Sequence, residues 1–146
     1  MFRGRSFHNV DTKSRISIPT GYRSEFERRS DKAPILTNIA NCLALYPYED
    51  WCEYEDKLLG ISSFDPDVQA FARFMVSGAV ECPIDKQGRI LVPPPLRQYA
   101  GIDREVVIAG LGSHLELWDR QRFETELAKT QARYDEISAS VAKLGA

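Results

Sequence analysis

The hydrophobic positions of this chain follow two periods that alternate along its length. In segments such as 15–18, apolar residues occupy every second position, which is typical of short β-strands. In segments such as 66–77, apolar residues recur every three or four positions, which predicts α-helices. Strands are therefore expected at residues 7–10, 15–18, 35–37, 42–46, 79–84, 89–92, 106–109 and 114–118. Helices are expected at residues 22–26, 47–60, 66–77, 94–100 and from 120 towards the C-terminus.

Turn and cap residues set the limits of these segments. Asp65 followed by Pro66 predicts the start of the helix at 66–77. Gly101 is suited to end the short helix at 94–100. Residues 11–14 are expected to join the first two strands as a hairpin with a basic tip, and the charged run 27–32 to form an exposed loop. The last helix carries an apolar seam that requires a partner, within the chain or on a neighbour. The seam consists of Phe123, Leu127, Tyr134, Ile137, Val141 and Leu144.

A ten-residue motif occurs twice, at 10–19 and at 84–93. Each copy has an apolar residue, an aspartate, three loop residues, an arginine and an alternating stretch that stops at a proline. The second copy lies 74 positions after the first, and the same offset relates Arg23 to Arg97. Each half of the chain is thus expected to contain a hairpin, a short helix, a second hairpin and a closing helix. One half alone has too small a core, so the two should pack with pseudo-two-fold symmetry.

Composition describes an ordinary globular chain of 146 residues, 43% hydrophobic and 27% charged, with one domain or two very small ones. The net charge of −2 conceals a segregation of charge. Residues 1–23 hold five basic residues and one acidic residue, whereas residues 47–70 hold seven acidic residues and one basic residue. Such segregation can build a positive face on an acidic protein. No apolar run is long enough for a membrane span and no signal peptide is evident, so a cytoplasmic protein is expected.

Metal and catalytic chemistry are not indicated. Cys42, Cys52 and Cys82 are an odd number at wide spacings, so buried small apolar roles are expected rather than disulfides or a zinc ribbon. His8 and His114 align with cysteines under the repeat offsets, but they lack metal-ligand spacing. There is no nucleophile elbow and no phosphate-binding glycine loop. We therefore expect no cofactor, no metal and no small-molecule substrate, and a protein that is not an enzyme.

Several motifs together resemble one known family. They are Met1–Gly4, the Asp-x-x-x-Arg pairs Asp11/Arg15 and Asp85/Arg89, Phe71–Phe74, Ser77–Ala79, and the turn Gly110–Gly112 before Glu116–Asp119. On these residues the chain resembles the MraZ family of bacterial transcriptional regulators, over nearly its whole length. The combination is far more specific than any single motif.

The resemblance implies an α+β fold in which two AbrB-like hairpin-helix-hairpin repeats form a pseudo-dimeric, swapped-hairpin β-barrel with flanking helices. The repeats are expected at 1–60 and 79–146, with a connecting helix at 61–78. The resemblance also implies a homo-oligomeric ring that binds repeated promoter boxes upstream of a cell-division and cell-wall gene cluster. A repressor associated with the nucleoid is the expected role.

For DNA binding, cations must reach phosphates, and a planar guanidinium can address guanine in the major groove. The candidate DNA-binding residues are Arg15, Lys13, Arg5 and Arg3, followed by Arg89 and Lys86 of the second copy. The two aspartates are expected to accept backbone N–H groups as Asx-turns, because a carboxylate repels phosphate. The residues expected to shape the motif are Asp11, Asp85, Gly88, Pro19 and Pro93.

Three alternatives stay open. Lys86 and Arg89 could lie on the same face as the first loop or be buried against a neighbouring subunit. Asp11 and Arg15 could pair across the loop only as a fold staple, although the local positive charge and the family resemblance favour DNA binding by Arg15. The whole chain could also be a ring-forming interaction module that contacts acidic protein partners without DNA readout.

One departure from the family pattern affects the first loop, because Ser14 stands where the second copy has Gly88. If that position needs a positive φ, Ser14 costs on the order of 1 kcal/mol and the loop could differ in shape.

Overall fold

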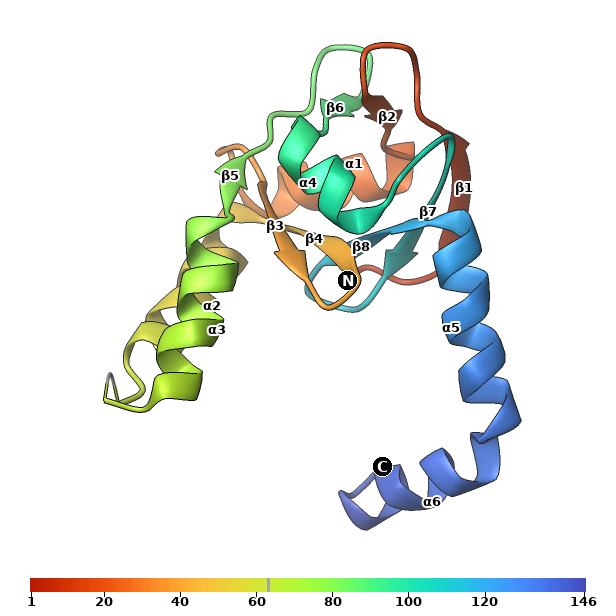
Figure 1. Cartoon of the computed structure of the whole chain (residues 1–146). Helices are drawn as coiled ribbons and strands as arrows, with labels where there is room; N and C mark the ends of the chain where they lie inside the picture. Colours follow the sequence, from red (N-terminus) through yellow and green to blue (C-terminus); the bar gives the residue numbers. More distant parts are fainter. Residues whose placement is uncertain (63) are drawn as a thin grey trace.

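The computed structural model of the protein describes residues 1–62 and 64–146 and has an α+β architecture (Figure 1). The strands are β1 (Arg5–Asn9), β2 (Arg15–Ser17), β3 (Ile35–Ile39), β4 (Cys42–Tyr46), β5 (Val80–Glu81), β6 (Arg89–Leu91), β7 (Glu105–Gly110) and β8 (Leu115–Asp119). The helices are α1 (Thr20–Arg29), α2 (Tyr48–Leu59), α3 (Pro66–Ser77), α4 (Pro94–Ala100), α5 (Arg120–Ala132) and α6 (Tyr134–Lys143). None of the helices in the described part of the chain is long and apolar enough to cross a membrane.

The two repeats exchange their first strands. β1 pairs with β7 of the second repeat, and β5 pairs with β3 of the first. These strands belong to an antiparallel six-stranded sheet of order β1-β7-β8-β4-β3-β5, and β2 pairs with β6 in a separate two-stranded ribbon. The β4–β8 contact lies at the centre of the sheet, so the strand order reads the same from either end when the repeats are interchanged. This is the pseudo-two-fold arrangement that the sequence predicts.

The expected barrel closure is not found. Within the described residues, β1 and β5 are the two ends of the six-stranded sheet and do not pair with each other. The expected ladder between the first two strands is also absent there, because β1 pairs with β7 and β2 pairs with β6. Residues 11–14 nevertheless form a tight turn, in which Asp11 N donates to Arg15 O over 3.0 Å.

The main core lies between the six-stranded sheet and the β2–β6 ribbon. Ile16 and Ile90 face each other across the ribbon, and both are fully buried against leucines and isoleucines of the sheet. Burial of each such side chain contributes about 1.5–3 kcal/mol. Of the three cysteines, Cys42 and Cys82 are buried as expected, whereas Cys52 is half-buried.

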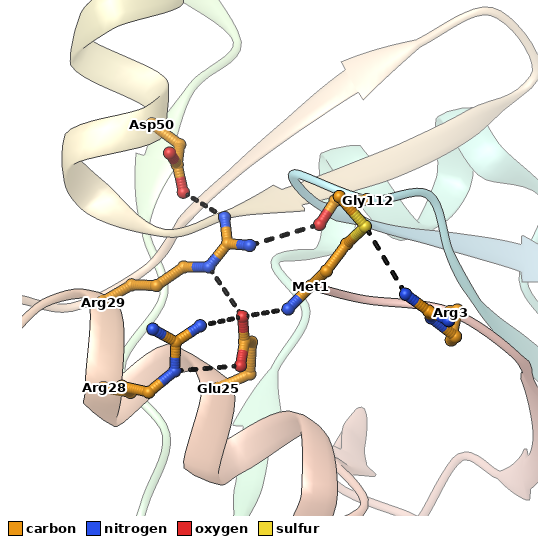
Figure 2. Close-up of polar contacts among 7 residues, drawn as sticks. All are labelled: Met1, Arg3, Glu25, Arg28, Arg29, Asp50 and Gly112. Atoms are coloured by element: carbon orange, nitrogen blue, oxygen red, sulfur yellow. Dashed lines mark hydrogen bonds and ion pairs between the residues drawn. The ribbon is translucent and has the colours of Figure 1, made fainter.

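The charged run after Phe26 is partly helical rather than an exposed loop. α1 continues to Arg29, whose Nη1 donates to Asp50 of α2 over 2.8 Å and whose Nε donates to Glu25 over 2.9 Å (Figure 2). Its Nη2 also donates to the carbonyl oxygen of Gly112. A hydrogen bond from the amino terminus of the chain, together with those from arginines of α1, lowers the pKa of Glu25 to about 2. These ion pairs fasten α1 to α2 and to the turn between β7 and β8.

The final helix is not continuous as expected but breaks at Arg133, where φ is −119° and ψ is 22°. The N–H group of Arg133 donates to the Thr130 carbonyl, three residues back, so the helix tightens and then changes direction. Phe123 and Leu127 pack against the sheet beside Trp118, whereas the seam residues after Arg133 belong to no core cluster among the described residues, and Leu144 is 88% exposed. α6 therefore projects away from the sheet (Figure 1).

Candidate nucleic-acid interface

The two copies of the repeated motif form loops at one end of the molecule (Figure 1). Residues 11–14 lead into β2, and residues 85–88 lead into β6. The pairing of β2 with β6 is extended at both ends, because Val92 N donates to Ser14 O over 3.0 Å and Ile18 N donates to Gly88 O over 2.8 Å. The loops thus stand at the two ends of one short ribbon and project to the same side. We call residues 11–15 and 85–89 the loop face.

In the first loop, the carboxylate of Asp11 organises both backbone and side chain. Its Oδ1 accepts the N–H groups of Lys13 and Arg15 over 2.8 and 2.9 Å, and its Oδ2 accepts Arg15 Nε over 2.7 Å. The backbone bond from Arg15 is the main cause that lowers the pKa of Asp11 to about 2. Only Nε of Arg15 is used, so within the described residues both of its terminal nitrogens have no acceptor. The Arg15 side chain is 28% exposed, and its two terminal nitrogens are the donors left for a planar acceptor.

The second loop repeats this arrangement with a longer ion pair. Asp85 Oδ1 accepts the N–H groups of Gln87 and Arg89, each over 2.9 Å, and Oδ2 accepts Arg89 Nε over 3.2 Å. The backbone bond from Arg89 is again the main cause that lowers the pKa of Asp85. One terminal nitrogen of Arg89 is occupied, because it donates to Gln87 Oε1 over 3.0 Å. The fork of Arg89 is therefore less available than that of Arg15.

Ser14 adopts the left-handed conformation of its glycine counterpart. Its φ is 62°, and that of Gly88 is 79°, so the first loop keeps the backbone shape of the second. For a residue other than glycine this conformation costs about 1–2 kcal/mol. Part of that cost is offset by a hydrogen bond of 2.6 Å from Arg97 Nη1 to Ser14 Oγ.

Pro19 and Pro93 mark the change from strand to helix in the two copies. They precede α1 and α4 with φ values of −53° and −59°, and neither has an N–H group to extend the ribbon. Their carbonyl oxygens accept the N–H groups of Arg23 and Arg97, over 2.9 and 3.0 Å. Each proline carbonyl therefore anchors the backbone of the arginine whose side chain extends to a loop.

Arg3 and Arg5 do not lie on the loop face. Arg5 begins β1 and its guanidinium lies 5.4 Å from the centre of the Phe123 ring, whereas Arg3 contacts the sulfur of Met1 (Figure 2). At about 3.3 Å per residue, β1 separates Arg5 from the loop end of the strand at Asn9 by about 13 Å. Arg3 and Arg5 thus lie at one end of β1, and Lys13 and Arg15 lie beyond its other end.

Comparison with known proteins identifies the family. A family model described as "MraZ protein, putative antitoxin-like" matches residues 1–74 and again residues 75–143. The chain belongs to the MraZ family. It is 41% identical over 145 residues to the transcriptional regulator MraZ of Halothermothrix orenii and 37% identical over 144 residues to that of Desulforamulus reducens, with 99% of each chain covered. It is also 41% identical over 138 residues to that of Moorella thermoacetica, with 94% of each chain covered. None of these names denotes an enzyme, in agreement with the expectation from the sequence.

The structure adds residues to the MraZ motif that the sequence did not assign to the site. Arg23 and Arg97 each reach the loop of the other repeat, Arg23 against Gly88 and Arg97 against Ser14. Their common offset of 74 was a signal, but the strand exchange that brings them to the loops is not visible in a local pattern. Lys13 and Lys86 are exposed and, among the described residues, form no ion pair.

Proposed function

We propose that this chain is a transcriptional regulator that binds DNA through the loop face. The observation that carries the proposal is the state of Arg15, whose Nε is held by Asp11 while both terminal nitrogens lack an acceptor among the described residues. A free, oriented fork suits the bidentate recognition of guanine O6 and N7. The names of the relatives as transcriptional regulators support the same role.

The other cations of the loop face have the properties of phosphate contacts. Lys13 and Lys86 are exposed at the two loops, and an ammonium group on a flexible stem binds phosphate as a point charge. Asp11 and Asp85 reduce the net charge of the loop face, so a single chain should bind DNA weakly. Arg3 and Arg5, at the other end of β1, belong to a second and lesser group of candidates.

We further propose that copies of the chain assemble into a ring that presents several loop faces to repeated promoter boxes. Linked sites gain affinity through effective concentration, which compensates for a weak single contact. Large apolar side chains exposed on α3 and α6 support assembly, since such surfaces usually bind partners. They are Phe71 and Phe74 on α3, Tyr134 and Val141 on α6, and Leu144 at the C-cap of α6. The proposed role is repression of a cell-division and cell-wall gene cluster by a protein associated with the nucleoid.

The test is footprinting of the full chain on the DNA upstream of its own gene, combined with binding measured against salt. We expect protection of short repeated boxes and a logarithmic affinity that falls linearly with the logarithm of salt, by about 0.9 per phosphate contact. Arg15→Ala should abolish the footprint and leave the oligomer mass unchanged. The control is Arg133→Ala, which removes an exposed arginine paired with Glu136.

The same exposed apolar residues also fit an assembly module that binds no DNA. In that case the chain would form oligomers of normal mass but give no footprint, and its loop variants would lose binding to an acidic protein instead. Absence of any salt-dependent binding to the upstream DNA would therefore reject the proposed regulator in favour of this module.

A further inference from the structure

Arg23 and Arg97 are related by the repeat, but their hydrogen bonding differs. Each nitrogen of the Arg97 guanidinium donates to one neutral acceptor. Its Nε donates to Ile102 O over 2.9 Å, its Nη1 to Ser14 Oγ over 2.6 Å, and its Nη2 to Asp103 O. Arg97 thus braces the first loop against the end of α4.

Arg23 lies in the same place on the second loop but is poorly satisfied. Its guanidinium covers Gly88, with atoms 2.4–2.7 Å from where a Cβ on that glycine would stand. One bond of 2.8 Å runs from Nη2 to Thr20 Oγ1. Its Nε is buried without any acceptor in the described part of the chain, and no carboxylate there pairs with the side chain. Unbonded buried donors of a charged group are costly and rare.

Two sequence differences explain the contrast. Gly88 has no hydroxyl group to correspond to Ser14 Oγ. The helix α4 ends at Gly101, so the carbonyls of the next two residues turn back to Arg97, whereas α1 continues to Arg29 and keeps the corresponding carbonyls in helical positions. The two repeats therefore share the arginine but not its three acceptors.

The surroundings of Arg23 open towards the second loop. The half-buried side chain lines a hollow of about 620 Å³ between α1 and the segment before β6. Two further cations line it, Lys86 of the loop face and Lys32, whose ammonium lies 4.6 Å from the centre of the Tyr48 ring. The carboxylates lining the hollow are Glu27, Asp31 and Asp85. The three cations and three carboxylates balance, so the hollow does not concentrate small free anions, whereas a duplex lying on the second loop would hold a phosphate there through its other contacts.

We propose that Arg23 is a phosphate-binding residue of the second loop and takes a backbone phosphate of bound DNA as the acceptor it lacks in the free chain. The inference rests on the proposed function. It makes the two loops unequal, since Arg97 is a structural brace of the first loop and Arg23 is a ligand at the second. A phosphate oxygen can accept from Nη1, which has no acceptor among the described residues, and from the buried Nε once the side chain turns towards the loop.

The test compares Arg23→Gln, Arg23→Lys and Arg97→Gln as full-length proteins binding the upstream duplex over a range of salt. Arg23→Gln should weaken binding by about tenfold, as expected for loss of a charged hydrogen bond, and reduce the salt slope by about 0.9 for each bound loop. Its thermal midpoint should not fall. Arg23→Lys should retain the slope because it keeps the charge. Arg97→Gln should lower the thermal midpoint and leave the slope unchanged at temperatures where it is folded.

An unchanged salt slope and affinity in Arg23→Gln, while the wild type binds, would overturn the inference without affecting the proposed function. Failure of the wild type to bind would instead reject the proposed function. A measurement with inorganic phosphate tests whether the ligand of Arg23 is a DNA phosphate or free phosphate. At matched ionic strength it should not raise the thermal midpoint of the wild type without DNA. A rise that Arg23→Gln abolishes would overturn the assignment to DNA and indicate a site for free phosphate.

Discussion

Each loop of this protein uses a carboxylate to hold an arginine by one nitrogen. Because Asp11 accepts the Nε of Arg15 and two backbone N–H groups, it fixes the loop and orients the guanidinium at the same time. We expect this orientation of Arg15 to strengthen DNA binding by more than the charge of Asp11 weakens it. Simple electrostatics predicts the opposite, which makes the residue informative to change.

Asp11→Asn should weaken DNA binding two- to tenfold, about the worth of one ordinary hydrogen bond. An asparagine oxygen can still accept the backbone N–H groups, but its amide nitrogen cannot accept from Arg15 Nε. The measurement is fluorescence anisotropy with the upstream duplex at fixed salt. Tighter binding by Asp11→Asn would show that the carboxylate only repels DNA and that the ion pair does not orient Arg15.

The same residue predicts a pH dependence of stability. The pKa of Asp11 is lowered from 3.8 to about 2 in the folded chain, so its stabilising contribution is complete above about pH 4 and is lost as the pH falls through about 2. The pKa of Glu25 is lowered in the same direction and contributes in the same window. Unfolding by denaturant between pH 5 and pH 2 should therefore show a smaller loss of stability in Asp11→Asn than in the wild type. Parallel curves would contradict the lowered pKa of Asp11.

At the scale of elements, the β2–β6 ribbon positions both loops. Its central pair, Ile16 and Ile90, is fully buried, whereas the neighbouring Leu91 is 59% exposed. Ile90→Ala should lower the free energy of unfolding by about 2–5 kcal/mol, and the control Leu91→Ala by less than about 1 kcal/mol. Chemical denaturation measures both. Equal effects of the two changes would mean that the ribbon does not sit on the core.

The elements that could be predicted from the sequence are those with local signals. Asp65 accepts the N–H group of Asp67 and begins α3, and Gly101 ends α4 with a φ of 65°, as expected from cap residues. The break at Arg133 could not be predicted, because the seam continues in sequence after the sheet that it packs on has ended. Strand exchange was equally hidden, since a strand pattern does not specify its partner.

The candidate site likewise combines features that the sequence predicts with features that depend on the tertiary structure. The repeated motif predicts the two loops, and the pseudo-two-fold symmetry predicts that they lie close together. The sequence grouped Arg3 and Arg5 with Lys13 because they are close along the chain, but an intervening strand separates them in space. Arg23 and Arg97 were left without a role because each acts on the opposite repeat.

At the scale of the whole molecule, the exchange of β1 and β5 makes each repeat depend on the other. Residues 1–60 and 61–146 expressed separately should each fail to unfold cooperatively as a monomer, because β7 loses β1 and β3 loses β5. Mixed or co-expressed, the two fragments should form a stable one-to-one complex. Circular dichroism and size-exclusion chromatography test this. A fragment that unfolds cooperatively as a monomer would show that the exchanged strands are dispensable.

We propose that DNA lies on the loop face and not along the whole basic N-terminal segment. The most direct measurement is photo-crosslinking to the upstream duplex from one photoreactive residue at a time, introduced at Thr12, Gln87 or Arg5. The first two positions are exposed on the two loops, and the third is at the far end of β1. We predict strong crosslinks from Thr12 and Gln87 and little or none from Arg5. Crosslinking from position 5 alone would place the DNA at the other end of β1 and exclude the loop face.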